Sequence, residues 1–79
     1  MTTSNLRALR ALIDAYADAF DAHETSCVDY GSAVQAVHNG PQRRDAHRAA
    51  LESARARYRE TSTAVRDARG AILAALAER

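Results

Sequence analysis

The sequence predicts an all-α fold: a two-helix antiparallel coiled-coil hairpin that completes a four-helix or larger bundle by oligomerisation. Three observations predict this class. Apolar and aromatic residues recur at alternating steps of three and four in both halves of the chain, which is the pattern of a coiled-coil helix. Nineteen of the 79 residues are alanine, the best helix former. Asn39-Gly40-Pro41, a typical helix break, stands between the two halves. We expect one domain over residues 1–79.

The first helix is predicted over about 4–38. It is expected to begin after Thr3-Ser4-Asn5, because short polar side chains accept hydrogen bonds from the first free backbone N–H groups. The positions expected to face the other helix, which we call the seam, continue through five heptads. On this interpretation Cys27 is a buried small hydrophobe and His23 is a core histidine. The predicted seam consists of Leu6, Leu9, Ile13, Tyr16, Phe20, His23, Cys27, Tyr30, Val34 and Val37.

The turn is predicted at 39–41 and the second helix over about 42–78. Gly40 is expected to take the left-handed conformation that ends many helices, and Pro41 suits the first turn of the next one. A turn at this place pairs Phe20 with Thr61 and His23 with Tyr58. The interior glycines, Gly31 and Gly70, are expected at points of close approach or mild bending. The second seam consists of Arg44, His47, Leu51, Ala54, Tyr58, Thr61, Val65, Ala68, Ile72 and Ala75.

A hairpin of two helices has no third layer to close its core, so we expect a partner. Small side chains beside the seam favour one flank for this contact, because helices approach closely where side chains are small. The expected occupant is a second copy of the chain or another helical protein. The predicted interface consists of Leu12, Ala19, Ser26 and Ala33 in the first helix with Ala50, Arg57, Ala64 and Ala71 in the second.

Charge is divided between the halves, although the net charge is only +1. Residues 1–39 carry two arginines and five acids, whereas residues 40–79 carry nine arginines and five acids. No apolar run approaches the roughly 18 residues of a membrane span, and the N-terminus has no basic and hydrophobic signal segment. We therefore expect no membrane partner and a cytoplasmic or assembly-bound protein.

No residues with catalytic, cofactor or metal-ligand spacing stand out, so we expect neither an enzyme nor a cofactor, a metal or a small-molecule substrate. His23, His38 and His47 have no further ligands at the usual spacing. An alternative is nucleic-acid binding through Arg55, Arg59 and Arg66, since a basic helix can lie along phosphates. Acids interleaved with these arginines are more typical of a salt-bridged surface helix.

Two family resemblances concern the helix starts and the bend. Leu9-Arg10-Ala11-Leu12-Ile13-Asp14 resembles the Leu-Arg-x-x-Ile-Asp opening of all-helical chorismate mutases, with Arg44-Asp45 near the place of their Arg-Glu pair. That resemblance implies an activity that depends on Arg10, but the chain has neither the lysine nor the third helix of those enzymes. His38-Asn39-Gly40 occupies the bend as the motif does in Trp-x-Gly hairpins, and residues 45–51 are similar to their second-helix start. Here the tryptophan and the C-terminal export signal are missing, so only the hairpin shape is implied.

The sequence therefore favours a non-enzymatic structural or adaptor protein that acts through helix–helix packing in a homo- or hetero-oligomeric assembly, such as a phage or bacterial complex. The alternatives are a nucleic-acid-binding hairpin, a hairpin of the Trp-x-Gly kind without its tryptophan, and an enzyme of the chorismate mutase type.

Overall fold

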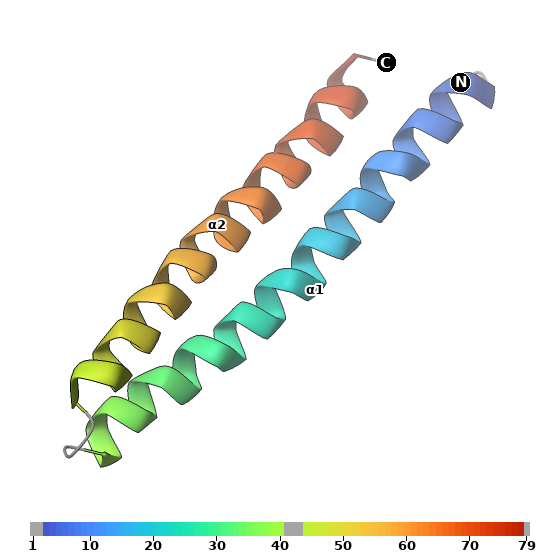
Figure 1. Cartoon of the computed structure of the whole chain (residues 1–79). Coiled ribbons are helices and arrows are strands. Elements are labelled where there is room, and N and C mark those ends of the chain that lie inside the picture. Colours follow the sequence, from blue (N-terminus) through green and yellow to red (C-terminus); the bar gives the residue numbers. More distant parts are fainter. Residues whose placement is uncertain (1–2, 41–43, 79) are drawn as a thin grey trace.

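The computed structural model describes residues 3–40 and 44–78 and confirms the all-α hairpin. Helix α1 (Thr3–Asn39) and helix α2 (Arg44–Ala77) lie side by side and run antiparallel, so that both chain ends lie at the same end of the rod (Figure 1). Helix α1 begins at Thr3, close to the predicted start at about residue 4, and it includes Asn39, which was predicted in the turn. Pro41, predicted in the turn, lies outside the described residues.

The rod measures 61 × 14 × 12 Å and has a radius of gyration of 17.7 Å. A compact domain of this length would have a radius of gyration of about 12 Å. Among the described residues only Ala54 and Ser26 are classed as buried, and they are 3% and 6% exposed. The hairpin therefore has a thin line of contact between two helices instead of a closed core.

The bend is held by contacts of Gly40, the residue after α1, with Ala36 of α1 and His47 of α2. The N–H of Gly40 donates to the carbonyl of Ala36 at 2.9 Å, which continues the helical pattern, and His47 donates from Nδ1 to the carbonyl of Gly40 at 3.1 Å. No glycine in the described ranges has a positive φ, so the predicted left-handed conformation of Gly40 is wrong. Gly40 instead makes room for His47, because a Cβ there would lie 2.5 Å from Cε1 of that ring.

The seam of α2 agrees with the prediction. The residues of α2 with reduced exposure include His47, Leu51, Ala54, Tyr58, Thr61, Val65, Ala68, Ile72 and Ala75.

The seam of α1 is rotated from the predicted one. Its less exposed residues also follow steps of three and four, and the line through Leu9 and Tyr16 is the predicted one. In the other line, each predicted residue from Ile13 to Val34 is replaced by the residue that precedes it in the sequence. The less exposed residues include Leu9, Leu12, Tyr16, Ala19, His23, Ser26, Tyr30, Ala33 and Val37. The small side chains at Ala19, Ser26 and Ala33 allow α2 to come close, and the larger residues between them pack above and below these points.

Aromatic contacts at mid-length show the register. The rings of His23 and Tyr58 lie 5.0 Å apart, which confirms their predicted pairing, and Tyr30 meets Tyr58 edge-on at 5.3 Å. Phe20 is 44% exposed and stacks on Tyr16 of its own helix, with ring centroids 6.3 Å apart. Its predicted place in the seam is therefore wrong, as is the burial of Cys27, which is exposed.

Candidate helix-docking surface

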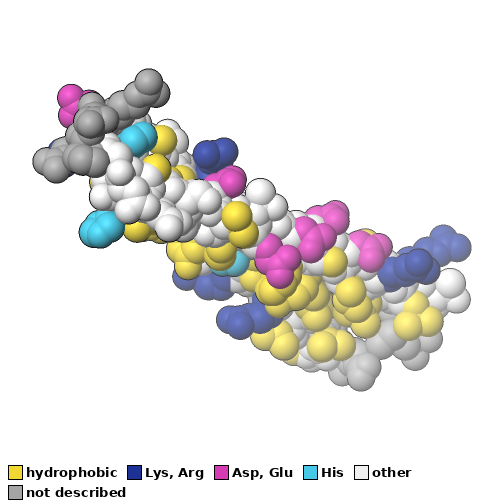
Figure 2. Space-filling view, turned by 90° about the horizontal axis from the view of Figure 1, so that it is seen from below, with side chains coloured by type: hydrophobic (Ala, Val, Ile, Leu, Met, Phe, Trp, Pro, Cys, Tyr) yellow, Lys and Arg dark blue, Asp and Glu magenta, His cyan; other side chains and the backbone are white. Residues whose placement is uncertain are grey.

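One side of α1 exposes a continuous line of apolar side chains, which we call the α1 column. Its members stand seven residues apart, which is nearly two helical turns, so they share one side of the helix. Leu6, Ile13, Phe20 and Val34 are 54%, 49%, 44% and 47% exposed, and Cys27 between them is also exposed. Figure 2 shows hydrophobic side chains gathered over the half of the rod that holds the termini, with acidic side chains along one edge. The α1 column consists of Leu6, Ile13, Phe20, Cys27 and Val34.

The α1 column adds a third apolar line to α1. Two of its lines, through Leu9 and Leu12, already face α2. Two lines are enough for a helix that packs against one neighbour, whereas three are typical of a helix packed between neighbours in a bundle. The equivalent line of α2, which we call the arginine line, consists of Arg48, Arg55, Ser62 and Arg69. Helix α1 therefore has the pattern of a helix with two neighbours, and α2 that of a helix with one.

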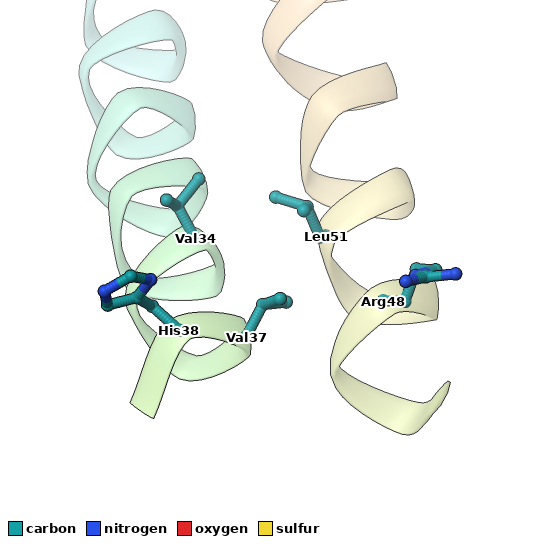
Figure 3. Close-up of a pocket in the computed structure, with 5 residues that line it drawn as sticks. All are labelled: Val34, Val37, His38, Arg48 and Leu51. Atoms are coloured by element: carbon teal, nitrogen blue, oxygen red, sulfur yellow. The ribbon is translucent and has the colours of Figure 1, made fainter. Parts of the chain in front are cut away.

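A hollow of roughly 420 Å³ lies beside the bend end of the α1 column. It is lined by Val34, Val37 and His38 of α1 and by Arg48 and Leu51 of α2. Val37 and Leu51 point into the space between the helices, whereas the side chains of His38 and Arg48 point away from it (Figure 3). Since Val34 and Arg48 line the same hollow, the α1 column and the arginine line of α2 border the same side of the hairpin.

The two helices carry opposite charges. Helix α1 has two arginines and five acids, a net charge of −3, and α2 has seven arginines and four acids, a net charge of +3. The arginine line borders the α1 column, and its Arg55 donates from Nε to the hydroxyl of Tyr30 at 3.4 Å. An apolar strip on an acidic helix thus lies next to a basic edge.

The predicted interface residues are divided between two places. Those of α1 do not form a free flank: Ser26 is buried, and Leu12, Ala19 and Ala33 are half-buried, so these four face α2. The rotation of the α1 seam explains this difference. On α2 the predicted residues keep an outward position, with Ala71 half-buried and the other three, Ala50, Arg57 and Ala64, exposed.

The thiol of Cys27, the imidazole of His23 and the hydroxyl of Thr61 form a row of hydrogen-bonded groups at the middle of the hairpin. Thr61 donates its only proton to the carbonyl of Arg57 or Tyr58, at 3.0 and 3.1 Å, so its oxygen accepts from Nδ1 of His23 at 3.0 Å. In the neutral ring Nε2 then accepts from Sγ of Cys27, at 3.7 Å. A thiol beside an imidazole is a nucleophile beside a base. The hollow by the bend, however, is lined by neither residue.

The remaining predicted residues lie on outer surfaces. Arg55, Arg59 and Arg66 are all exposed. In residues 3–40 and 44–78, no three or more His, Cys, Asp or Glu side chains come together as metal ligands would. Neither described helix contains an 18-residue stretch apolar enough to cross a bilayer. Comparison with models of known protein families, with curated proteins and with solved structures gave no match to this chain.

Proposed function

We propose that the protein is a non-enzymatic structural or adaptor module whose α1 column docks another helix within a homo- or hetero-oligomeric assembly. The observation that carries the proposal is the exposure of four large apolar side chains, Leu6, Ile13, Phe20 and Val34, in one line on α1. Scattered exposed apolar residues are ordinary on protein surfaces, but a contiguous strip is typical of an interaction site.

The total accessible surface supports the proposal. The chain exposes 6,058 Å², whereas a compact protein of 8.6 kDa would expose about 4,700 Å². The surplus is about 1,400 Å² per chain, and a specific interface of standard size buries about 800 Å² on each partner. A neighbour that covered this surplus would therefore bury more area than a standard interface requires.

The test compares two acidic substitutions on α1. Phe20 and Val28 are both exposed, at 44% and 68%, but only Phe20 belongs to the α1 column. Phe20→Glu is expected to abolish assembly, because docking would bury an unpaired carboxylate at a cost of several kcal/mol. Val28→Glu should leave assembly unchanged. Sedimentation equilibrium gives the mass, and far-UV circular dichroism shows whether the helices persist.

The wild-type chain is expected to exceed the mass of one chain at micromolar concentration. Its unfolding midpoint should rise with chain concentration, because association stabilises the folded state by mass action. A helical wild-type monomer whose midpoint does not depend on concentration would refute the homo-oligomeric form of the proposal. Assembly that is equally strong in the Phe20→Glu variant would show that the α1 column is not the docking surface.

A second candidate function is nucleic-acid binding, which is favoured by the exposure of Arg55, Arg59 and Arg66 on α2. Contacts with phosphates would make the affinity fall steeply with salt. Replacing all three arginines by glutamine should then abolish a gel shift of RNA or DNA at low salt. A titration without any shift for the wild-type chain would exclude this candidate.

A further inference from the structure

We infer that the occupant of the α1 column is a second copy of this chain, related to the first by a two-fold axis parallel to the helices. The two α1 helices then run in the same direction, and each lies in the groove between α1 and α2 of the other copy. This inference rests on the proposed function and adds to it the identity of the neighbour, the symmetry and the register.

Area and shape fit a second copy. If each chain buries its surplus of about 1,400 Å², the interface totals about 2,800 Å², which lies in the range of obligate homodimers. A two-fold interface brings the same patch of both chains together. The column supplies an apolar line that matches itself, whereas the large exposed apolar residues of described α2 are Leu73 and Leu76, near its C-terminal end.

Charge selects the direction of the axis. An axis perpendicular to the helices would place α1 on α1 and α2 on α2, so that helices of net −3 face each other and helices of net +3 do likewise. An axis parallel to the helices also brings the two α1 helices into contact, but it places each acidic α1 against the basic α2 of the other copy as well and keeps the two α2 helices apart. Because complementary charges favour one arrangement over another, the parallel axis is preferred. The arginine line through Arg55 and Arg69 then borders the docked α1.

With the parallel axis, each residue of the α1 column lies against the same residue of the second copy. Ile13 lies against Ile13, Phe20 against Phe20 and Cys27 against Cys27 of the second copy. A perpendicular axis that overlaps the whole column would be centred on Phe20 and would place Ile13 of one chain against Cys27 of the other. Within one chain these two positions are about 21 Å apart along the helix, which is too far for direct crosslinking.

The test is crosslinking of the Ile13→Cys variant, which retains the native Cys27, by mild oxidation and by a short bis-maleimide. Digestion after Asp and Glu separates the two cysteines, since Asp14, Asp18, Asp21 and Glu24 lie between them, and mass spectrometry then identifies the linked peptides. We expect 13–13 and 27–27 links between chains. The matched control is Ala11→Cys with Cys27→Ser, in which the single thiol lies on the opposite side of α1 and no crosslinked dimer is expected.

The outcomes separate this inference from the proposed function. An assembly in which 13–27 links dominate would have a perpendicular axis, and an assembly that gives no links would have another neighbour on the column. Either result overturns the inference and leaves the proposed function standing. A wild-type monomer at every concentration overturns the inference together with the homo-oligomeric form of the proposed function. Weakening of the dimer by salt together with 13–13 and 27–27 links supports the inference.

Discussion

The chain's three glycines occupy two kinds of environment, and alanine substitution should give different results in them. A Cβ at Gly31 or Gly70 would have no neighbouring atom within 4 Å, whereas at Gly40 it would lie 2.5 Å from Cε1 of His47 and 3.1 Å from the carbonyl oxygen of Ala36. Gly31 and Gly70 therefore do not mark the close approaches that their place in the sequence suggested.

The expected free energies follow from these contacts. Gly31→Ala and Gly70→Ala should each stabilise the hairpin by about 1 kcal/mol, the difference in helix propensity between the two residues. Gly40→Ala would force the imidazole of His47 to rotate away and lose its hydrogen bond to the Gly40 carbonyl, which contributes about 0.5–1.5 kcal/mol. That loss is comparable with the gain of about 0.4–1 kcal/mol expected for alanine at a compatible backbone position, so little or no net stabilisation is expected.

The His47→Ala background isolates the role of the ring. Once the imidazole is absent, Gly40→Ala should be more favourable than in the wild-type chain by about 0.5–1.5 kcal/mol, because it no longer breaks the hydrogen bond of His47. The contact of the new Cβ with the carbonyl oxygen of Ala36, at 3.1 Å, is the same in both backgrounds. Urea unfolding followed by circular dichroism, at one fixed chain concentration, gives all four corners of the cycle. If Gly40→Ala stabilised the wild-type chain as much as the His47→Ala chain, His47 would not pack on Gly40 and the described bend would be incorrect.

Two further predictions test the seam and the register. At a concentration too low for assembly, Ser26→Leu should destabilise the hairpin by about 1–3 kcal/mol, because it inserts a large side chain between closely packed helices. Under the same conditions Cys27→Leu should change the stability by less than about 0.5 kcal/mol. Equal effects in urea unfolding would contradict the observed rotation of α1. At a concentration too low for assembly, Tyr58→Ala should lower the free energy of unfolding by about 1–3 kcal/mol, because two aromatic pairs are lost. Phe20→Ala should lower it by less. The reverse order would favour the seam predicted from the sequence.

The fold class and the seam of α2 could be predicted because the sequence offers a single choice there. In α2 the residues flanking the seam line on one side are Arg48, Arg55, Ser62 and Arg69, so only one pair of lines is apolar. The hydrophobic period and the break at residues 39–41 are then sufficient to predict the hairpin and the side of α2 that faces α1. The bend itself was predicted in place but not in conformation, because the packing of His47 on Gly40 depends on how the second helix folds back.

The seam of α1 could not be predicted from periodicity because two neighbouring lines compete. The line through Leu9, Tyr16, His23, Tyr30 and Val37 belongs to either solution. The second line of the seam could consist either of the larger residues of the α1 column or of Leu12 and the smaller residues that follow it at seven-residue intervals. Hydrophobicity favours the larger set, but the distance between two helices is limited by side-chain size, and this steric condition favours Ala19, Ser26 and Ala33.

The rotation of α1 changes which surface is free and therefore what the candidate site is. With the predicted seam, the outward flank of α1 would hold Leu12 and three small residues, Ala19, Ser26 and Ala33, and a partner would gain little apolar contact there. With the observed seam, the outward flank holds Leu6, Ile13, Phe20 and Val34, whose burial contributes roughly 25 cal/mol for each Å² removed from water. Docking a neighbour is thus driven by large apolar side chains on one helix, and the basic line of α2 beside them decides which orientation of that neighbour is favoured.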